Sequence, residues 1–300
     1  MTLGECIARG EAQFLQSNVQ FGQGTLTAWD EARWLVLAAL DLPVDSPIEV
    51  EQQRLTEAQV AAVNALLARR IQERQPAAYL THTAWLKGYS FYVDERVIIP
   101  RSFIAELIMD QFQQWGVSAA GLTRVLDACT GSGCLAILLA ETFPQAAIVA
   151  SDLSAEALEV AAINVSQYGL ADRIRLVHSD ALSAIPEQPF DLIVSNPPYV
   201  PAHKRARLPP EFRQEPDMAL IAPDAGMAVV RQLLRDAPRF LSDQGLLVIE
   251  IGHEKKACQH LLKHEFGAMP VQWVRTAEQH DNVFVVSQSV LRRHPWRSAP

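Results

Sequence analysis

The chain has 300 residues, 49% of them hydrophobic, and carries a formal net charge of −8 at pH 7. A chain of this length buries roughly three-quarters of its unfolded surface when it folds, and it is long enough for about two domains. The acidic balance argues against DNA or another nucleic acid as the main partner, because such binding relies on a basic surface, and it suits a basic protein partner instead.

The sequence shows neither a membrane span nor a secretory leader, so we expect a cytoplasmic protein. The N-terminus lacks a basic start followed by an apolar core, and no apolar run reaches the roughly eighteen residues of a spanning helix. The four cysteines form no Cys-x-x-Cys pair, which suits a reduced compartment. His260 and His264 lie one helical turn apart without a third ligand, so we expect no metal site.

Residues 1–80 are predicted to form a small helical unit. Thr27 with Asp30 has the pattern of a helix cap before an apolar helix at 32–40, and Thr56 with Gln59 precedes a second helix. In that second helix, apolar residues recur at helical spacing. The simplest role of the unit is packing.

Residues 81–100 are predicted to form a β-hairpin that links the helical unit to the rest of the chain. The pattern consists of aromatic and β-branched residues around a glycine, namely Trp85, Gly88, Phe91, Tyr92 and Val93. Aromatic residues in such a hairpin more often pack in a core than contact a partner.

A strand, a glycine turn and a helix are predicted at residues 124–140. Gly131 and Gly133 allow a tight turn that brings backbone N–H groups close to a ligand. The next predicted strand ends at Asp152, about twenty residues further on, where a carboxylate can accept both hydroxyls of a ribose. These residues predict a nucleoside cofactor. A dinucleotide dehydrogenase shares the pattern, including Ala136 at the third glycine position, so the pattern alone leaves the cofactor open.

Asp180 follows the next predicted strand, 173–177. Ligands of open α/β sheets bind at the carboxyl ends of the strands, so Asp180 should lie near Asp152 and could face an adenine amino group. An aspartate that bonds to its local backbone in a turn explains the residue almost as well.

Asn196-Pro197-Pro198-Tyr199 follows the apolar run 190–194. The two prolines restrict the backbone, so the Asn196 side chain and the Pro197 carbonyl should point in set directions. Two such acceptors can bind both N–H groups of an amide or an exocyclic amine, and Tyr199 can supply a flat face for a planar group. The alternative is an ordinary turn that ends a strand.

The C-terminal third continues the alternation of helices and strands. We expect a helix at 226–241, a buried strand at 245–251, a helix at 253–264, and a closing pair of strands at 271–275 and 283–287. These elements predict an α/β fold.

Together these segments resemble S-adenosylmethionine-dependent methyltransferases that act on planar amino groups. The segment from Asp127 to Gly133 looks like the family's cofactor loop, Asp152 like its ribose acid, Asp180 like its adenine contact, and 196–199 like its amino-acceptor motif. The resemblance implies a seven-stranded, mostly parallel Rossmann-like sheet whose last strand is antiparallel, with S-adenosylmethionine as the cofactor.

Two further segments resemble the HemK family of protein glutamine N5-methyltransferases. They are 94–101, which ends in Pro100-Arg101, and 215–220. The residues after Arg101, together with Cys129, look like the branch that methylates large-subunit ribosomal protein three. The alternatives are the release-factor branch and an RNA amino methyltransferase. Phe103, where a proline is expected, and Ala225, where an aspartate is usual, depart from the family pattern.

The resemblance implies a methyltransferase domain at 101–300, with the helical unit gripping a ribosomal protein substrate. Contact with ribosomal RNA through the basic run 203–207 is a minor hypothesis, and the oligomeric state stays open. The residues implied in catalysis are Asn196, Pro197 and Tyr199. Those implied in cofactor binding are Pro100, Arg101, Asp127, Thr130, Gly131, Gly133, Asp152, Asp180 and Asn196.

Overall fold

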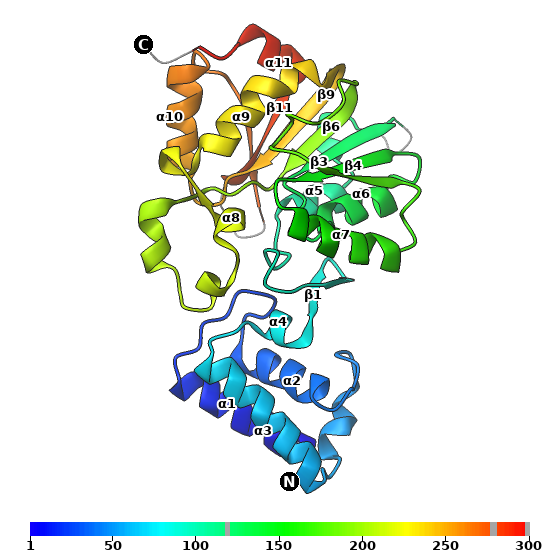
Figure 1. Ribbon diagram of the computed structural model, residues 1–300, viewed down its shortest axis with the longest axis vertical. Helices are drawn as coiled ribbons and strands as arrows, with labels where there is room; N and C mark the ends of the chain where they lie inside the picture. Colours follow the sequence, from blue (N-terminus) through cyan, green and yellow to red (C-terminus); the bar gives the residue numbers. More distant parts are fainter. Residues whose placement is uncertain (118–120, 277–280, 298–300) are drawn as a thin grey trace.

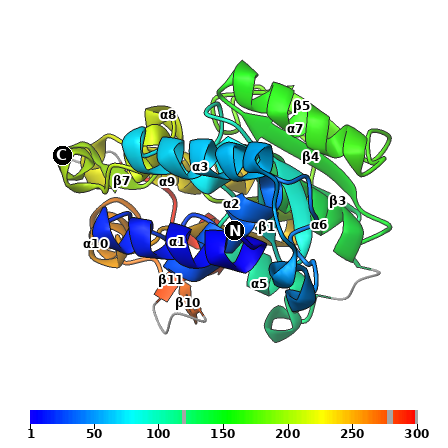
Figure 2. The same cartoon turned by 90° about the horizontal axis from the view of Figure 1, so that it is seen from below.

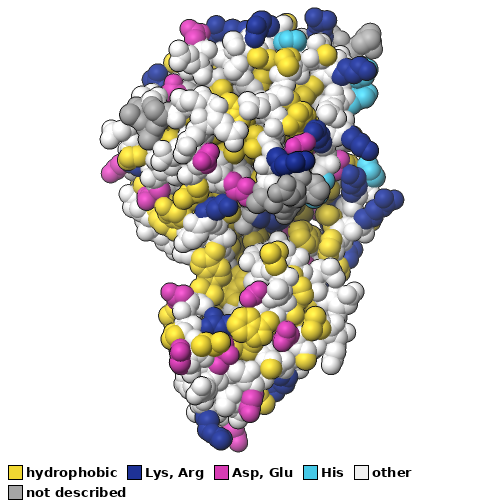
Figure 3. Space-filling view, turned by 180° about the vertical axis from the view of Figure 1, so that it is seen from behind, with side chains coloured by type: hydrophobic (Ala, Val, Ile, Leu, Met, Phe, Trp, Pro, Cys, Tyr) yellow, Lys and Arg dark blue, Asp and Glu magenta, His cyan; other side chains and the backbone are white. Residues whose placement is uncertain are grey.

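The computed structural model describes residues 1–117, 121–276 and 281–297. A helical lobe formed by the N-terminal part of the chain lies below a larger lobe built around a β-sheet (Figure 1). In the space-filling view the molecule narrows between the two lobes, and apolar side chains gather on the helical lobe and at this waist (Figure 3). Within the described ranges, no helix is long and apolar enough to cross a membrane.

The helical lobe contains four α-helices and a 3₁₀ turn. They are α1 (Leu3–Gln16), α2 (Ala28–Ala38), the turn at Ile48–Gln52, α3 (Glu57–Gln72) and α4 (Ala77–Thr81). Seen from below, α1, α2 and α3 run side by side (Figure 2). Their buried residues join those under the sheet in one continuous apolar cluster.

Both predicted caps are present in the helical lobe. Thr56 and Gln59 form a reciprocal capping box at the start of α3, and the Thr27 hydroxyl accepts from the Asp30 N–H. Because Thr27 is itself the N-cap, α2 begins at Ala28, four residues before the predicted start.

The hairpin consists of β1 (Thr83–Leu86) and β2 (Tyr89–Tyr92), paired antiparallel around Gly88. Val93 lies just beyond the second strand. The hairpin docks on the larger lobe through Asn164, whose side chain exchanges two hydrogen bonds of 2.7 and 3.0 Å with the Tyr92 backbone. The boundaries at residues 80 and 100 remain a prediction.

The larger lobe is built on a seven-stranded sheet in the order β10-β11-β9-β6-β3-β4-β5. The strands are β3 (Arg124–Ala128), β4 (Ala147–Asp152), β5 (Ile174–His178), β6 (Phe190–Ser195), β9 (Leu241–Glu250), β10 (Gln272–Arg275) and β11 (Asp281–Ser287). The first five are parallel to one another, and β11 is antiparallel to both of its neighbours. The predicted sheet, including its antiparallel last strand, is confirmed.

Helices cover both faces of the sheet, which explains why most residues of its central strands are apolar (Figure 1). One face carries α5 (Ile104–Met109), α6 (Cys134–Thr142) and α7 (Ala155–Gln167), and the other carries α9 (Ala228–Asp236), α10 (Lys255–Glu265) and α11 (Gln288–Arg293). Short elements between β6 and α9 include β7 (Val200–Pro201), α8 (Asp217–Leu220) and β8 (Ile221–Ala222).

Several C-terminal elements begin or end at residues other than the predicted ones. The predicted helix at 226–241 is shorter, because Gly226 has a φ of +87° and Pro238 lies in a separate 3₁₀ turn. β9 begins at Leu241 instead of residue 245. The α10 helix begins at Lys255, beyond Gly252, which has a φ of +48°.

The strand register brings the carboxyl ends of the central strands together. Ala128 of β3 is paired with Ser151 of β4 and with Ser195 of β6, and Ser195 is paired in turn with Ile249 of β9. The residues that follow these positions therefore lie side by side along one edge of the sheet. This edge is where ligands of open α/β sheets bind.

Candidate active site

The predicted glycine loop joins β3 to α6. Cys129, Gly131 and Gly133 have φ values of +61°, +56° and +79°, so three of its five residues adopt the left-handed conformation. A Cβ on Gly133 would come within 3.3 Å of the Ala161 Cβ on α7, so glycine permits close packing there. Cys129 occupies a conformation that favours glycine, at a cost of about 1–2 kcal/mol.

Asp127 supports the loop from inside the protein. One of its carboxylate oxygens accepts from the Thr130 hydroxyl at 2.5 Å and from the Ala136 N–H at 3.1 Å. The side chain is fully buried, and this burial raises the pKa of Asp127 to about 7. Asp127 and Thr130 therefore fix the shape of the loop, and neither lines the cavity that lies beside it.

Asp152 lies where β4 ends, beside the glycine loop. Its two oxygens accept from the Gly131 N–H and from the Ser154 N–H, both at 2.9 Å. Burial raises the pKa of Asp152. Asp180 follows β5, and its carboxylate accepts from the Gln232 side chain at 3.3 Å. A carboxylate oxygen has two lone pairs, so these contacts leave acceptor capacity for a ligand.

The acceptor turn, residues 196–199, follows β6. The Ser195 hydroxyl donates to the Ala128 carbonyl at 2.8 Å, which attaches the start of this turn to the end of β3. Asn196 and Pro198 line the cavity beside the glycine loop, whereas Pro197 is buried and Tyr199 lies outside the lining.

A cavity of about 280 Å³ lies at this edge of the sheet. Four predicted residues line it: Gly131, Asp152, Asp180 and Asn196. The other lining residues come partly from the same loops and partly from segments elsewhere in the chain: Glu95, Arg96, Val97, Ile98, Cys129, Leu153, Ser154, Glu156, Ala157, Ala181, Pro198, Pro216, Met218, Ala219 and Val229.

The lining combines apolar surface with excess negative charge. Leu153, which is 50% exposed, lies next to Asp152 and offers apolar surface to a flat ring. Among the described residues that line the cavity, four are acids, Glu95, Asp152, Glu156 and Asp180, and one is a base, Arg96. The lining therefore favours a ligand that combines an apolar, flat part with a positive charge.

Two cavity walls come from the segments that resemble the HemK family. One wall is 95–98, just before Pro100, and the other includes Pro216 and Met218. Sequence reasoning expected Pro100 and Arg101 of the first segment to bind the cofactor, but it did not predict that 95–98, Pro216 and Met218 line the cavity. A signal was available, because both segments flank the predicted site in the sequence.

Pro100 is buried, and neither it nor Arg101 lines the cavity. The Arg101 guanidinium donates two hydrogen bonds of 2.7 Å to the buried carboxylate of Glu215, in the segment after the acceptor turn. It also lies over the Phe212 ring, 5.3 Å from the centroid. Arg101 thus holds the Pro216 wall in place.

Glu250, at the end of β9, is a support that sequence reasoning missed. Its carboxylate accepts from the Ser102 hydroxyl at 2.6 Å and from the Phe103 N–H at 2.9 Å. Burial raises the pKa of Glu250 to about 7. The expected proline has no N–H, so Phe103 allows a contact that the usual residue could not make.

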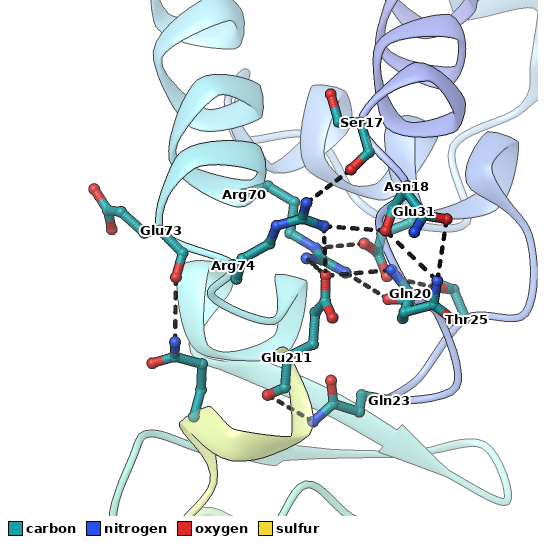
Figure 4. Close-up of polar contacts among 11 residues, drawn as sticks. Ser17, Asn18, Gln20, Gln23, Thr25, Glu31, Arg70, Glu73, Arg74 and Glu211 are labelled. Atoms are coloured by element: carbon teal, nitrogen blue, oxygen red, sulfur yellow. Dashed lines mark hydrogen bonds and ion pairs between the residues drawn. The ribbon is translucent and has the colours of Figure 1, made fainter. Parts of the chain in front are cut away.

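Glu211 connects the segment after the acceptor turn to the helical lobe (Figure 4). Its fully buried carboxylate lies 3.4 Å from Arg70 and 3.1 Å from Arg74, both from the end of α3 and its following turn. Arg70 is buried too and pairs with Glu31 of α2 at 2.6 Å. The two lobes are therefore joined by a buried ionic network.

The remaining predicted features lie apart from the cavity. In the basic run 203–207, Lys204 pairs with Glu254 and Arg205 pairs with Asp217. Ala225 adopts a left-handed turn with a φ of +55°. Among the residues that the structure describes, no cluster of three or more His, Cys, Asp or Glu side chains is arranged to hold a metal ion.

Comparisons with known proteins also indicate a methyltransferase. Residues 105–214 match the family described as methyltransferase small domain. The chain is 44% identical to the ribosomal protein uL3 glutamine methyltransferase of Burkholderia pseudomallei, covering 97% of this chain and 95% of that protein. It is 43% identical to the proteins of the same name from Neisseria meningitidis serogroup B and Bordetella pertussis, covering 97% of this chain and 94% and 96% of theirs.

Among solved structures, the catalytic domain of hMettl16, in complex with MAT2A 3′UTR hairpin 6, is similar in fold. The TM-score is 0.53 at 16% sequence identity, over 78% of this chain and 82% of that one. At this identity the likeness shows a shared methyltransferase fold.

Proposed function

Because the chain belongs to the family of ribosomal protein uL3 glutamine methyltransferases, we propose that it methylates a glutamine of uL3, protein three of the large ribosomal subunit. The methyl group passes from S-adenosylmethionine to the side-chain amide nitrogen. The observation that carries the proposal is that Asn196 of the acceptor turn and Asp152 of the cofactor side line one cavity.

The cofactor side of the cavity is proposed to hold S-adenosylmethionine. Asp152 would accept the ribose hydroxyls, Asp180 would face the adenine amino group, and Leu153 would pack on the adenine ring. Gly131 lets the backbone approach the ligand, and the acidic lining favours a positive charge. When bound, this cofactor supplies an electrophilic methyl carbon attached to a sulfonium.

The acceptor turn is proposed to hold the glutamine carboxamide. The nitrogen of an amide is a poor nucleophile because its lone pair is delocalised, so orientation matters more than a strong base. Asn196 and the Pro197 carbonyl would accept its two N–H groups and face the nitrogen as it becomes positive. The proton then passes to water. Tyr199 as a platform for the amide remains a prediction.

The substrate protein would approach the waist, where the segment after the acceptor turn meets the helical lobe. We propose that the helical lobe grips uL3 in the cytoplasm, where ribosomal proteins are made. The pairing of Lys204 and Arg205 with acids of this chain leaves less of the basic run available for ribosomal RNA. Contact with RNA is therefore a minor part of the proposal.

The test is a methyl-transfer assay with radiolabelled S-adenosylmethionine and three separate acceptors: purified uL3, a release factor and ribosomal RNA. We expect label on uL3 alone, and mass spectrometry of its peptides should find one added methyl group on a glutamine. The matched control is uL3 in which that glutamine is replaced by alanine, which should take up no label.

Equal or greater labelling of the release factor would overturn the substrate assignment. Label that ribonuclease removes would overturn the protein acceptor altogether.

A further inference from the structure

Two glycines from different segments, Gly226 and Gly252, pack closely against Tyr199. A Cβ added to Gly226 would lie 2.0 Å from the Tyr199 carbonyl oxygen and 2.8 Å from its carbonyl carbon. A Cβ added to Gly252 would lie 2.5 Å from Cε2 and 2.8 Å from Cζ of the Tyr199 ring. Real Cβ atoms do not approach other atoms this closely, so only glycine fits at either position with Tyr199 in place.

These contacts come from two different parts of the sheet edge. Gly226 precedes α9, whereas Gly252 follows the end of β9. One glycine contacts the backbone of Tyr199 and the other contacts its ring, so the residue is enclosed from two directions. Displacing Tyr199 would be costly, because neighbouring atoms in a packed interior have little room to move.

We propose that Gly226 and Gly252 are positioning residues that clamp Tyr199 and thereby hold Asn196 in its orientation for methyl transfer. The inference rests on the proposed function of the acceptor turn. Ser195 anchors the start of the turn through its hydrogen bond to the Ala128 carbonyl, and the clamp anchors its end. Tyr199 lies outside the cavity lining, which fits an anchor better than a platform.

Fixing both ends of a four-residue turn has a direct effect on the residue at its start. Asn196 must aim its oxygen at one amide N–H, and a misplacement of about 1 Å in such a site can cost about 10²-fold in rate. An alanine Cβ at position 226 must displace the Tyr199 peptide group, and one at position 252 must displace the Tyr199 ring. The cofactor side, formed by other loops, should not move with it.

The test replaces each glycine with alanine and includes a control for backbone strain. Gly88 has a φ of +85° and Gly169 a φ of +66°, and a Cβ on either would meet no atom within 4 Å. Gly88→Ala is therefore the control for Gly226→Ala, and Gly169→Ala is the control for Gly252→Ala. Each control introduces a side chain at a positive φ without a clash.

We expect Gly226→Ala and Gly252→Ala to lower kcat for uL3 by about 10²-fold. Their S-adenosylmethionine affinity, measured by calorimetry, should stay within about twofold of the parent, and both controls should keep the parent kcat. A Gly252→Ala enzyme that transfers methyl groups as fast as Gly169→Ala would overturn the clamp. So would a loss of cofactor affinity as large as the loss of kcat.

A double-mutant cycle on Tm keeps the clamp testable if a variant folds poorly. In a Tyr199→Ala background the ring is absent, so Gly252→Ala should lower Tm no more than Gly169→Ala does. An undiminished fall in that background contradicts the clamp. Because Tm needs no substrate, the cycle tests the clamp even if the parent enzyme fails to methylate uL3, which would refute only the proposed function.

Discussion

The two sides of the cavity are held together in different ways. On the cofactor side, Asp127 bonds to Thr130 three positions away, and Gly131 bonds to Asp152 across 21 positions. On the acceptor side, Arg101 reaches Glu215 across 114 positions and Arg70 reaches Glu211 across 141. The cofactor side is supported by its own loops, whereas the acceptor side depends on the N-terminal part of the chain.

This difference separates the two substrates of the reaction. A cofactor of fixed chemistry suits a rigid site built from neighbouring strand ends. A protein substrate must be recognised over a larger surface. The buried network connects the helical lobe, which we propose grips the substrate, to the acceptor segment. We therefore expect mutations on the two sides to affect different measurements.

The largest expected effect comes from breaking the network at Glu211. Glu211→Ala leaves Arg70 buried without one of its two carboxylates, and loss of one partner from a buried pair costs about 3–5 kcal/mol. Denaturant unfolding should show this loss of stability. Asp217→Ala, which removes the exposed pair with Arg205, is the control and should change stability little. Equal stability of the two variants would show that the lobes are not joined through Glu211.

Asn196→Ala should abolish most of the transfer while sparing the cofactor. We expect kcat to fall roughly 10²–10³-fold, as for the loss of one preorganised transition-state hydrogen bond, with affinity for S-adenosylmethionine nearly unchanged. Asn196→Asp should be milder because it keeps an acceptor oxygen. Single-turnover transfer at the parent rate by Asn196→Ala would remove this residue from the mechanism.

Asp152→Ala should have the opposite profile. Loss of hydrogen bonds to a charged group should weaken S-adenosylmethionine binding by about 1.5–3 kcal/mol. The Asp152 oxygens also accept from Gly131 and Ser154, so Asp152→Asn serves as a variant of similar shape. Calorimetry measures both affinities, and unchanged binding by a folded Asp152→Ala would place the ribose elsewhere.

The smallest expected effect concerns backbone strain at Cys129. Its φ of +61° favours glycine, so Cys129→Gly should raise the free energy of unfolding by about 0.5 kcal/mol, after the greater freedom of glycine in the unfolded chain is subtracted. Cys129→Ala keeps the Cβ and should give no gain. If Cys129→Ala is also more stable than the parent, the gain comes from removing the thiol, whose pKa is raised by burial, and not from relieving backbone strain.

The cofactor side was largely predictable from the sequence because its residues follow the strands that position them. Gly131 was predicted in the glycine turn after a strand, and Asp152 and Asp180 at the ends of the next two strands. These three residues line the cavity, as does Asn196, which was predicted at a strand end on the acceptor side. Their roles in binding and catalysis remain predictions that the variants above test.

Asn196 was predicted from a local pattern, but the residues that support the acceptor side from a distance were not. Glu211 and Glu250 carry no motif of their own, and Glu215 was used only as part of the family-like segment 215–220. Each of the three bonds to a partner far away in the sequence, so its supporting role could not be predicted from its neighbours. Arg101 was expected at the cofactor, and its contact with Glu215 depends on tertiary packing that a local pattern does not contain. The same holds for the glycines around Tyr199, whose meaning appears only when their neighbours are known.

The buried network also bears on how the protein is made. Translation delivers α1 to α3 well before Glu211 leaves the ribosome, and N-terminal units generally fold first during synthesis. Arg70 and Arg74 are therefore in place when their partner arrives. The acceptor segment can be locked as it emerges, so a chain whose N-terminal helices misfold would complete its sheet and cofactor loop yet leave the methyl acceptor side unassembled.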